Sequence, residues 1–190
     1  MKYLLIILLC FSCAQVEKKS YQTEKLSKTL SIKTKYFLSL FPKKSQITQL
    51  VTYKKGDDVK RTQVVFKRNE DLRVTVLSPM GIELISLRVT NDGIEKISGI
   101  NQFKIEFFGR VMADMLAVYA SKKILLASIQ GEINIKDTVS RREIISEDIS
   151  LIKIDYGTKR DWSSDIELNH LEQNYKLNIK TLSLENENIY

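Results

Sequence analysis

Between residues 46 and 98, apolar and polar positions alternate with a period of two, which is typical of half-buried β-strands. Short segments rich in Gly, Asn and Asp separate the alternating stretches and are typical of turns. Strands joined in series by such turns predict an antiparallel meander. The expected strands are Gln46–Lys54, Arg61–Lys67, Leu72–Ser78, Ile82–Val89 and Ile94–Ser98.

The period changes to three or four residues between 105 and 121, which predicts an amphipathic helix of about four turns. A single long helix among so many strands has no helical partner, so it should pack on the sheet. A second, shorter helix is expected between Leu30 and Phe41, where neither period dominates.

Alternation returns after the helix and predicts strands at 124–130, 132–136, 139–145, 149–156, 166–170 and 175–182. About eleven antiparallel strands are too many for a flat, open sheet, so the sheet should curl into an unclosed barrel. The expected fold class is therefore mainly β (α+β), with the helix as a lid over an apolar hollow that suits an acyl chain.

Apolar side chains of the strands and of the helix would line this hollow. The candidates are Val64, Phe66, Leu72, Val74, Val76, Ile82, Leu84, Phe108, Met112, Met115 and Tyr119. Methionine adapts to apolar ligands of variable shape, so the stripe of Met and aromatic residues on the helix can contact an acyl chain. Ordinary core packing is the alternative, and in a half-barrel one residue can do both.

One expected turn, Ser78-Pro79-Met80-Gly81, places an apolar residue where a side chain normally meets water. Pro at the second position and Gly at the fourth suit a type I turn. Met80 therefore either packs back into the core or meets an apolar partner outside the fold.

The chain begins MKYLLIILLCFSCA, a lysine followed by an apolar run from Tyr3 to Phe11. This run is too short to span a membrane and has the form of a secretory signal. Ser12-Cys13-Ala14 resembles the lipobox of bacterial lipoproteins, in which the cysteine is joined to diacylglycerol. Residues 1–12 are then a signal peptide, and Cys13 is the lipidated first residue. An ordinary signal peptide that is cut nearby is the alternative.

The rest of the chain divides by composition into a polar tether over 13–29, a folded domain over 30–184 and a frayed tail over 185–190. Both cysteines, Cys10 and Cys13, precede this domain, so it cannot form an internal disulfide.

Composition and motifs exclude most other functions. The formal net charge is +7, but the lysines are dispersed and an exported chain rarely meets nucleic acid, so a surface that tolerates anionic lipid head groups is expected. No G-x-S-x-G nucleophile elbow accompanies the single histidine, His170, and no metal-ligand spacing does either. We therefore expect no enzyme activity, no cofactor and no metal, with a hydrolase around His170 as the alternative.

Five segments carry a family resemblance. They read VFKRNEDLRVTVLSPMGIELISLRV, RVMADMLAVY, SRREI, LIKIDY and IELNHLEQNYKLNIKTL. In this order they resemble an uncharacterised family of bacterial lipoproteins whose members are commonly encoded with aryl-polyene and other fatty-acid-like synthesis genes. That family is similar to the outer-membrane lipoprotein receptor LolB and, more distantly, to its soluble partner LolA.

The resemblance implies a LolA/LolB-like unclosed β-barrel with a helical lid that holds acyl chains. It also implies that Pro79, Met80 and Gly81 form a membrane-contact loop, because LolB has an exposed hydrophobic residue at a Pro-apolar-Gly turn. The other matched positions are Arg110, Ala113, Asp114, Arg141, Tyr156 and Tyr175.

Together these features predict a lipoprotein of the outer membrane that faces the periplasm and binds or transfers acyl chains, lipid-like products or lipoproteins. Its partners would be the membrane through the lipid anchor, an acyl chain or lipidated cargo, and a periplasmic carrier protein. Ala14, in place of Asp after Cys13, favours the outer membrane in enterobacteria-like sorting. The alternative is a non-catalytic envelope protein that docks enzymes or transporters of a lipid or pigment pathway.

Overall fold

The structure is a computed structural model that describes residues 34–99, 105–128, 132–147, 149–157, 162 and 165–186. Within these residues, three helices accompany ten strands. The helices are α3 (Thr34–Leu38), α4 (Ile105–Tyr119) and α5 (Lys122–Ser128). The strands are β1 (Ser45–Lys55), β2 (Asp58–Arg68), β3 (Leu72–Leu77), β4 (Glu83–Val89), β5 (Ile94–Gly99), β6 (Asn134–Asp137), β7 (Arg141–Ser146), β8 (Ile149–Tyr156), β9 (Ile166–His170) and β10 (Tyr175–Asn186).

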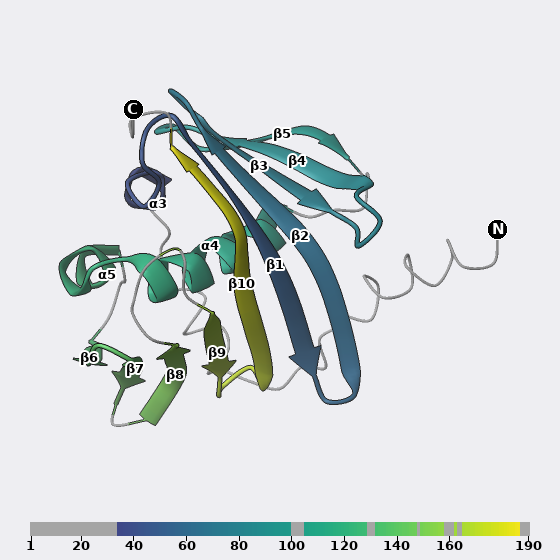
Figure 1. The fold of residues 1–190 in the computed structure, drawn as a ribbon. Coiled ribbons are helices and arrows are strands. Elements are labelled where there is room, and N and C mark those ends of the chain that lie inside the picture. Colours follow the sequence, from purple (N-terminus) through teal and green to yellow (C-terminus); the bar gives the residue numbers. More distant parts are fainter. Residues whose placement is uncertain are drawn as a thin grey trace.

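All ten strands belong to one antiparallel sheet in the order β5-β4-β3-β2-β1-β10-β9-β8-β7-β6. Each half of the chain forms a meander, and β1 joins the two halves by pairing with β10. The two end strands, β5 and β6, do not pair with each other, so the sheet is open. Figure 1 shows the sheet curving around helix α4. The expected fold class, a mainly β unclosed antiparallel barrel with a helix across it, is confirmed.

The expected strand at 124–130 is wrong, which is why the described residues contain ten strands and not about eleven. Residues 122–128 form helix α5, in which Leu125 is buried and Leu126 is 43% exposed. Ser121 caps this helix, because its Oγ accepts a hydrogen bond from the Ile124 amide at 3.3 Å and its carbonyl accepts one from Leu125. The capping serine was a sequence signal for a helix that the short apolar run concealed.

The short helix expected between residues 30 and 41 is present as α3. Its buried Phe37 packs edge to face against Phe41, at 5.2 Å between ring centroids, and against Phe108 of α4, at 6.4 Å. Helix α3 therefore packs against α4 through aromatic side chains. Residues 30–33 lie outside the described part of the chain.

The strand register decides which side chains of the first meander face the core. Val64 lies opposite Val76, and Phe66 lies opposite Val74. These residues therefore share one face, as the alternating pattern predicted. On β4 the residues opposite this inner row are Ile85, Leu87 and Val89, all at most 1% exposed.

Ile82 and Leu84 were therefore assigned to the wrong face. Ile82 lies before β4 and is 59% exposed, and Leu84 alternates with the buried Ile85 and so points to the outer face. The register shifts between Val76 and Leu77, and an odd shift moves a whole strand's apolar set to the other face. Which set of alternating residues in β4 faces the core depends on the turn and on this register shift. The alternation within β4 does not reveal it.

Candidate functional site

The turn between β3 and β4 is held together by Ser78. Its carbonyl accepts a hydrogen bond from the Gly81 amide at 2.9 Å, and its Oγ accepts one from the Ile82 amide at 3.1 Å. The Ser78 amide donates to the Ile82 carbonyl at 2.8 Å. Gly81 has φ 78°, in the left-handed region that glycine adopts without strain. The β-turn predicted at these residues is confirmed, and its backbone is well restrained.

This turn presents two apolar side chains to solvent. Met80 is 78% exposed and Ile82 is 59% exposed, whereas Ser78 beneath them is buried. Of the two alternatives for Met80, the structure shows the exposed one. We call Met80 and Ile82 the apolar tip.

Helix α4 and the sheet that curves around it (Figure 1) share one cluster of buried apolar residues. Among the predicted cavity-lining residues, Val64, Phe66, Leu72, Val74, Phe108, Met112 and Met115 are buried, and Val76 and Tyr119 are half-buried. All nine belong to or pack against one continuous cluster, so the structure brings the two predicted surfaces together as a packed core.

The interior near the end of α4 also contains polar groups. Gln49 of β1 is fully buried, and its Nε2 donates to the Tyr119 hydroxyl at 2.7 Å and to Thr181 Oγ1 at 3.1 Å. Gln49 Oε1 has no hydrogen-bond partner in the described part of the chain. The Tyr119 ring stacks on Trp162 at 3.8 Å between centroids. The interior near the end of α4 therefore holds a buried amide beside aromatic side chains.

Asp114 of α4 forms a buried link to Tyr175 of β10. The Tyr175 hydroxyl donates to Oδ2 at 2.8 Å and to Oδ1 at 3.0 Å. Burial raises the pKa of Asp114 to about 7, although the Tyr175 hydrogen bond and the charge of Arg110 act in the opposite direction. The family resemblance marked both Asp114 and Tyr175, and the structure shows that they form a pair.

Arg142 of β7 holds the last turn of α4. Its side chain is fully buried, and Nη1 donates to the carbonyls of Ala117 at 2.7 Å and Ala120 at 2.8 Å. Asp137 balances its charge, with contacts of 3.1 Å to Nε and 2.7 Å to Nη2. The carbonyls at the end of a helix lack partners within the helix, so Arg142 satisfies two of them.

Tyr156 of β8 acts at the same place, since its hydroxyl donates to the Val118 carbonyl at 2.7 Å. Burial raises the pKa of Tyr156, so it stays a neutral donor. The family resemblance marked Arg141 and not its neighbour Arg142. Arg141 is exposed and forms an ion pair with Asp155 on the surface, at 2.7 Å between Nε and Oδ1.

His170 of β9 is placed as a core side chain. Its Nδ1 accepts a hydrogen bond from the Gln173 amide at 3.3 Å, and its ring packs on Tyr175 at 4.9 Å between centroids. Burial, assisted by the charge of Arg110, lowers the pKa of His170 to about 4. A catalytic triad requires a serine hydroxyl and a carboxylate that are hydrogen-bonded to the histidine ring. Within the described residues, His170 has neither of these partners.

Sequence reasoning did not single out Gln49 or Arg142. Each is a polar residue in phase with buried apolar neighbours of the same strand, Ile47 for Gln49 and Ile144 for Arg142. A polar residue at an inward position of an alternating strand was therefore the available signal.

Several predictions concern residues outside the described part of the chain. These are the signal peptide at 1–12, the lipidation site Cys13 and the tether at 13–29. In the described part, no helix has the length and apolar character needed to cross a membrane. The same part holds no group of three or more His, Cys, Asp or Glu residues that could bind a metal ion.

Solved structures with a similar course of the chain include two bacterial proteins. A LolA superfamily protein from Nitrosomonas europaea has a TM-score of 0.43 and 11% identity, over 84% of this chain and 96% of that protein. A DUF1329 family protein from Desulfovibrio piger has a TM-score of 0.39 and 10% identity, over 85% of this chain and 95% of that protein. No curated protein matches the sequence.

A family of proteins matches most of the chain by its sequence profile. The match covers residues 46–183, which include the apolar tip, helix α4 and the strands that hold it. The chain therefore belongs to the family described as protein of unknown function (DUF3261).

Proposed function

We propose that this protein is a lipoprotein of the outer membrane, anchored through Cys13 and facing the periplasm, that binds or transfers acyl chains, lipid-like products or lipoproteins. The observation that carries the proposal is the apolar tip, which Ser78 holds in an exposed position. An apolar tip on a restrained turn suits contact with a bilayer, because its burial in lipid removes apolar area from water.

The cargo would lie between the first half of α4 and the sheet. In the described residues, the side-chain hydrogen bonds from the strands reach the second half of α4 and the residue after it. They involve Asp114, the Tyr119 hydroxyl and the carbonyls of Ala117, Val118 and Ala120. Phe108 and Met112, in contrast, are held by apolar packing. Such packing is not directional, so an acyl chain can replace it when the first half of α4 moves away from the sheet. Each methylene that enters contributes about 0.8 kcal/mol.

Bound lipid tests this proposal directly. The lipidated protein, purified from membranes in mild detergent, should release acyl species into organic solvent beyond those of its own anchor, and mass spectrometry identifies them. Met112→Ala should increase binding of an added fluorescent fatty acid, because a cavity under α4 accepts apolar ligands. Ile135→Ala removes a buried side chain from the far strand β6 and should leave fatty-acid binding unchanged. An extract without acyl species, together with no fatty-acid binding, would contradict the proposal.

The second candidate is an envelope interaction protein that docks enzymes or transporters of a lipid or pigment pathway. The observation in its favour is the packed cluster around α4, in which Met112, Leu116 and Ala117 are at most 1% exposed. A filled interior needs no cargo, and the apolar tip would then contact a protein. This candidate predicts no bound acyl species, and it predicts that Met80→Glu removes an envelope protein that co-purifies with the wild type.

A further inference from the structure

A row of cations crosses the outer face of the sheet, on the side opposite helix α4. Lys67 of β2 lies opposite Arg73 of β3, and Arg73 lies opposite Arg88 of β4. Each alternates with buried core residues of its own strand, so all three side chains point outward. Like charges directly opposite each other on a sheet repel, which is a cost that a bound anion would relieve.

Only one of these three cations has carboxylate partners in the described residues. The Arg88 guanidinium lies 4.0 Å from Asp71 Oδ2 and 3.5 Å from Glu95 Oε2. Arg73 instead donates its Nε to the neutral Ser86 Oγ at 2.9 Å. Lys67 makes no ion pair in this part of the chain. Among the residues that the structure describes, these two adjacent positive charges therefore have no carboxylate partner.

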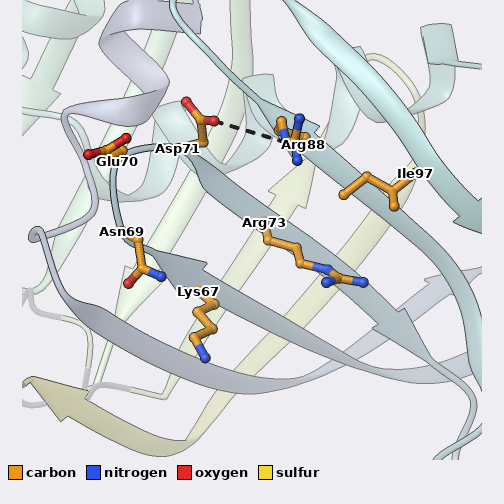
Figure 2. A pocket seen from close by; sticks show the side chains of 7 residues that line it. All are labelled: Lys67, Asn69, Glu70, Asp71, Arg73, Arg88 and Ile97. Atoms are coloured by element: carbon orange, nitrogen blue, oxygen red, sulfur yellow. Dashed lines mark ion pairs between the residues drawn. The ribbon is translucent and has the colours of Figure 1, made fainter.

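The row lines a hollow of about 580 Å³ on the outer surface. Figure 2 shows the seven lining residues, which are Lys67, Asn69, Glu70, Asp71, Arg73, Arg88 and Ile97. In this view the charged ends of Lys67 and Arg73 extend in different directions, both away from the carboxylates of Glu70 and Asp71, which lie at the β2–β3 turn. The hollow thus has a cationic end and an acidic end.

We propose that Lys67 and Arg73 bind a phosphate group at the cationic end of this hollow. Ser86 is fully buried and holds Arg73 Nε, which leaves both terminal nitrogens of the guanidinium for two parallel hydrogen bonds to a phosphate. Lys67 adds a point charge opposite it. The nearby Glu70 and Asp71 repel long polyanions, so the site selects a compact phosphate, carried by a phospholipid head group or by a small soluble molecule.

Inorganic phosphate is the first probe, added to the mature chain while backbone amide shifts are followed by NMR. Saturable shifts are expected at residues 67–73 and 86–88. Lys67→Gln should weaken binding roughly tenfold, the usual effect of losing a hydrogen bond to a charged group. Arg61→Gln removes the same charge from the same face of β2, outside the hollow, and should leave the affinity within about twofold of wild type.

Vesicles of phosphatidylglycerol distinguish the two sources of phosphate. Reduced co-sedimentation of Lys67→Gln, but not of Arg61→Gln, assigns the site to a lipid head group. Binding of inorganic phosphate without such a vesicle difference assigns it to a soluble phosphate. Equal behaviour of Lys67→Gln and Arg61→Gln in both experiments would overturn the proposal. Acyl-chain binding is measured separately on the other side of the sheet, so either result leaves the proposed function to its own test.

Discussion

Met80 remains exposed because the residues around it form a short, closed turn. Ser78 ties the two ends together through its backbone and its Oγ, and Gly81 supplies the left-handed backbone that closes the turn. The methionine lies at the outermost position of this turn, where its side chain is 78% exposed. The sequence predicted the turn from Pro79 and Gly81, because turn chemistry is local. It did not decide between core and surface for Met80, because burial depends on whether another element covers the turn.

Met80→Glu should weaken association of the lipid-free domain with vesicles and slow transfer of cargo to them, because a charge replaces an apolar contact. Its free energy of unfolding should stay within about 0.5 kcal/mol of wild type, as is usual at exposed sites. Vesicle co-sedimentation and urea unfolding measure the two effects.

Val139→Glu is the matched control for this change. Val139 is 74% exposed and lies between β6 and β7, in the other half of the sheet. If both variants lost vesicle binding equally, the effect would come from net charge and not from the apolar tip. A large loss of stability in Met80→Glu alone would return Met80 to a structural role.

At the scale of elements, three strands of the second meander supply side chains that donate hydrogen bonds to helix α4 and the residue after it. Arg142 comes from β7, Tyr156 from β8 and Tyr175 from β10. The sequence predicted the helix and its apolar face because amphipathic periodicity is a local property. It did not identify the polar partners, because residues 22 to 61 positions away in the chain meet α4 only after the sheet has formed.

Arg142→Ala should lower the free energy of unfolding by about 2–4 kcal/mol, because it removes a fully buried side chain that donates hydrogen bonds to the carbonyls of Ala117 and Ala120 and pairs with Asp137. Arg141→Ala should change the free energy of unfolding very little, since the Arg141–Asp155 pair lies on the surface and is screened by solvent. Urea denaturation of the two variants compares neighbouring arginines on opposite faces of one strand. Similar losses in both would contradict the role assigned to Arg142.

Asp114 and His170 should make opposite contributions to stability between about pH 4 and 7. The Asp114 pKa rises from 3.8 to about 7 on folding, so the folded state holds the extra proton and this contribution falls as the pH rises. The His170 pKa falls from 6.5 to about 4, so the unfolded state holds the extra proton and this contribution falls as the pH drops. The two effects partly cancel in the wild type.

Single variants separate the two contributions. Relative to wild type, Asp114→Asn should become more stable as the pH rises from 4 to 7, and His170→Gln should become more stable as the pH falls over the same range. Both groups contact Tyr175, and the charge of Arg110 acts on the pKa of each. Thermal melting at several pH values measures these trends. If the melting temperature of all three proteins changed with pH in the same way, the roles assigned to Asp114 and His170 would be refuted.

At the scale of the whole molecule, the fold depends on one pairing between the ends of the domain. Strand β1 pairs with β10 from Ser45 opposite Asn186 to Lys54 opposite Lys176. This pairing joins two meanders that are otherwise local, and it creates the continuous sheet that surrounds α4. Contacts so distant in sequence are slow to form, so we expect this step to limit the folding rate.

Anchoring also belongs to this scale. Cys13→Ser should prevent lipidation and move the protein from the membrane fraction to the soluble periplasmic fraction. Cys10→Ser, three residues earlier, should leave membrane attachment intact. Cell fractionation with labelled palmitate measures both variants. Labelling of Cys13→Ser with loss of labelling in Cys10→Ser would place the lipid on the other cysteine.

The sequence by itself determined the strand positions, helix α4, the β3–β4 turn and the open antiparallel class of the fold. These features depend on periodicity and turn chemistry, which act over a few residues. The helix at 122–128 was one exception, because in a run of seven residues the apolar positions are compatible with either period. The end of β10 was another, because pairing with β1 extends this strand to Asn186, into the segment expected as a frayed tail.

The tertiary structure alone decided which residues share the interior and which share the outer face. It placed Ile85, Leu87 and Val89 inside, with Ile82 and Leu84 outside, because a register shift sets the parity of a whole strand. It also buried Arg142 and Gln49, paired Asp114 with Tyr175, and aligned Lys67 with Arg73 and Arg88. The buried polar contacts depend on pairings between distant segments, and the alignment of β2, β3 and β4 depends on the register of their hairpins. The alternation within a single strand encodes neither.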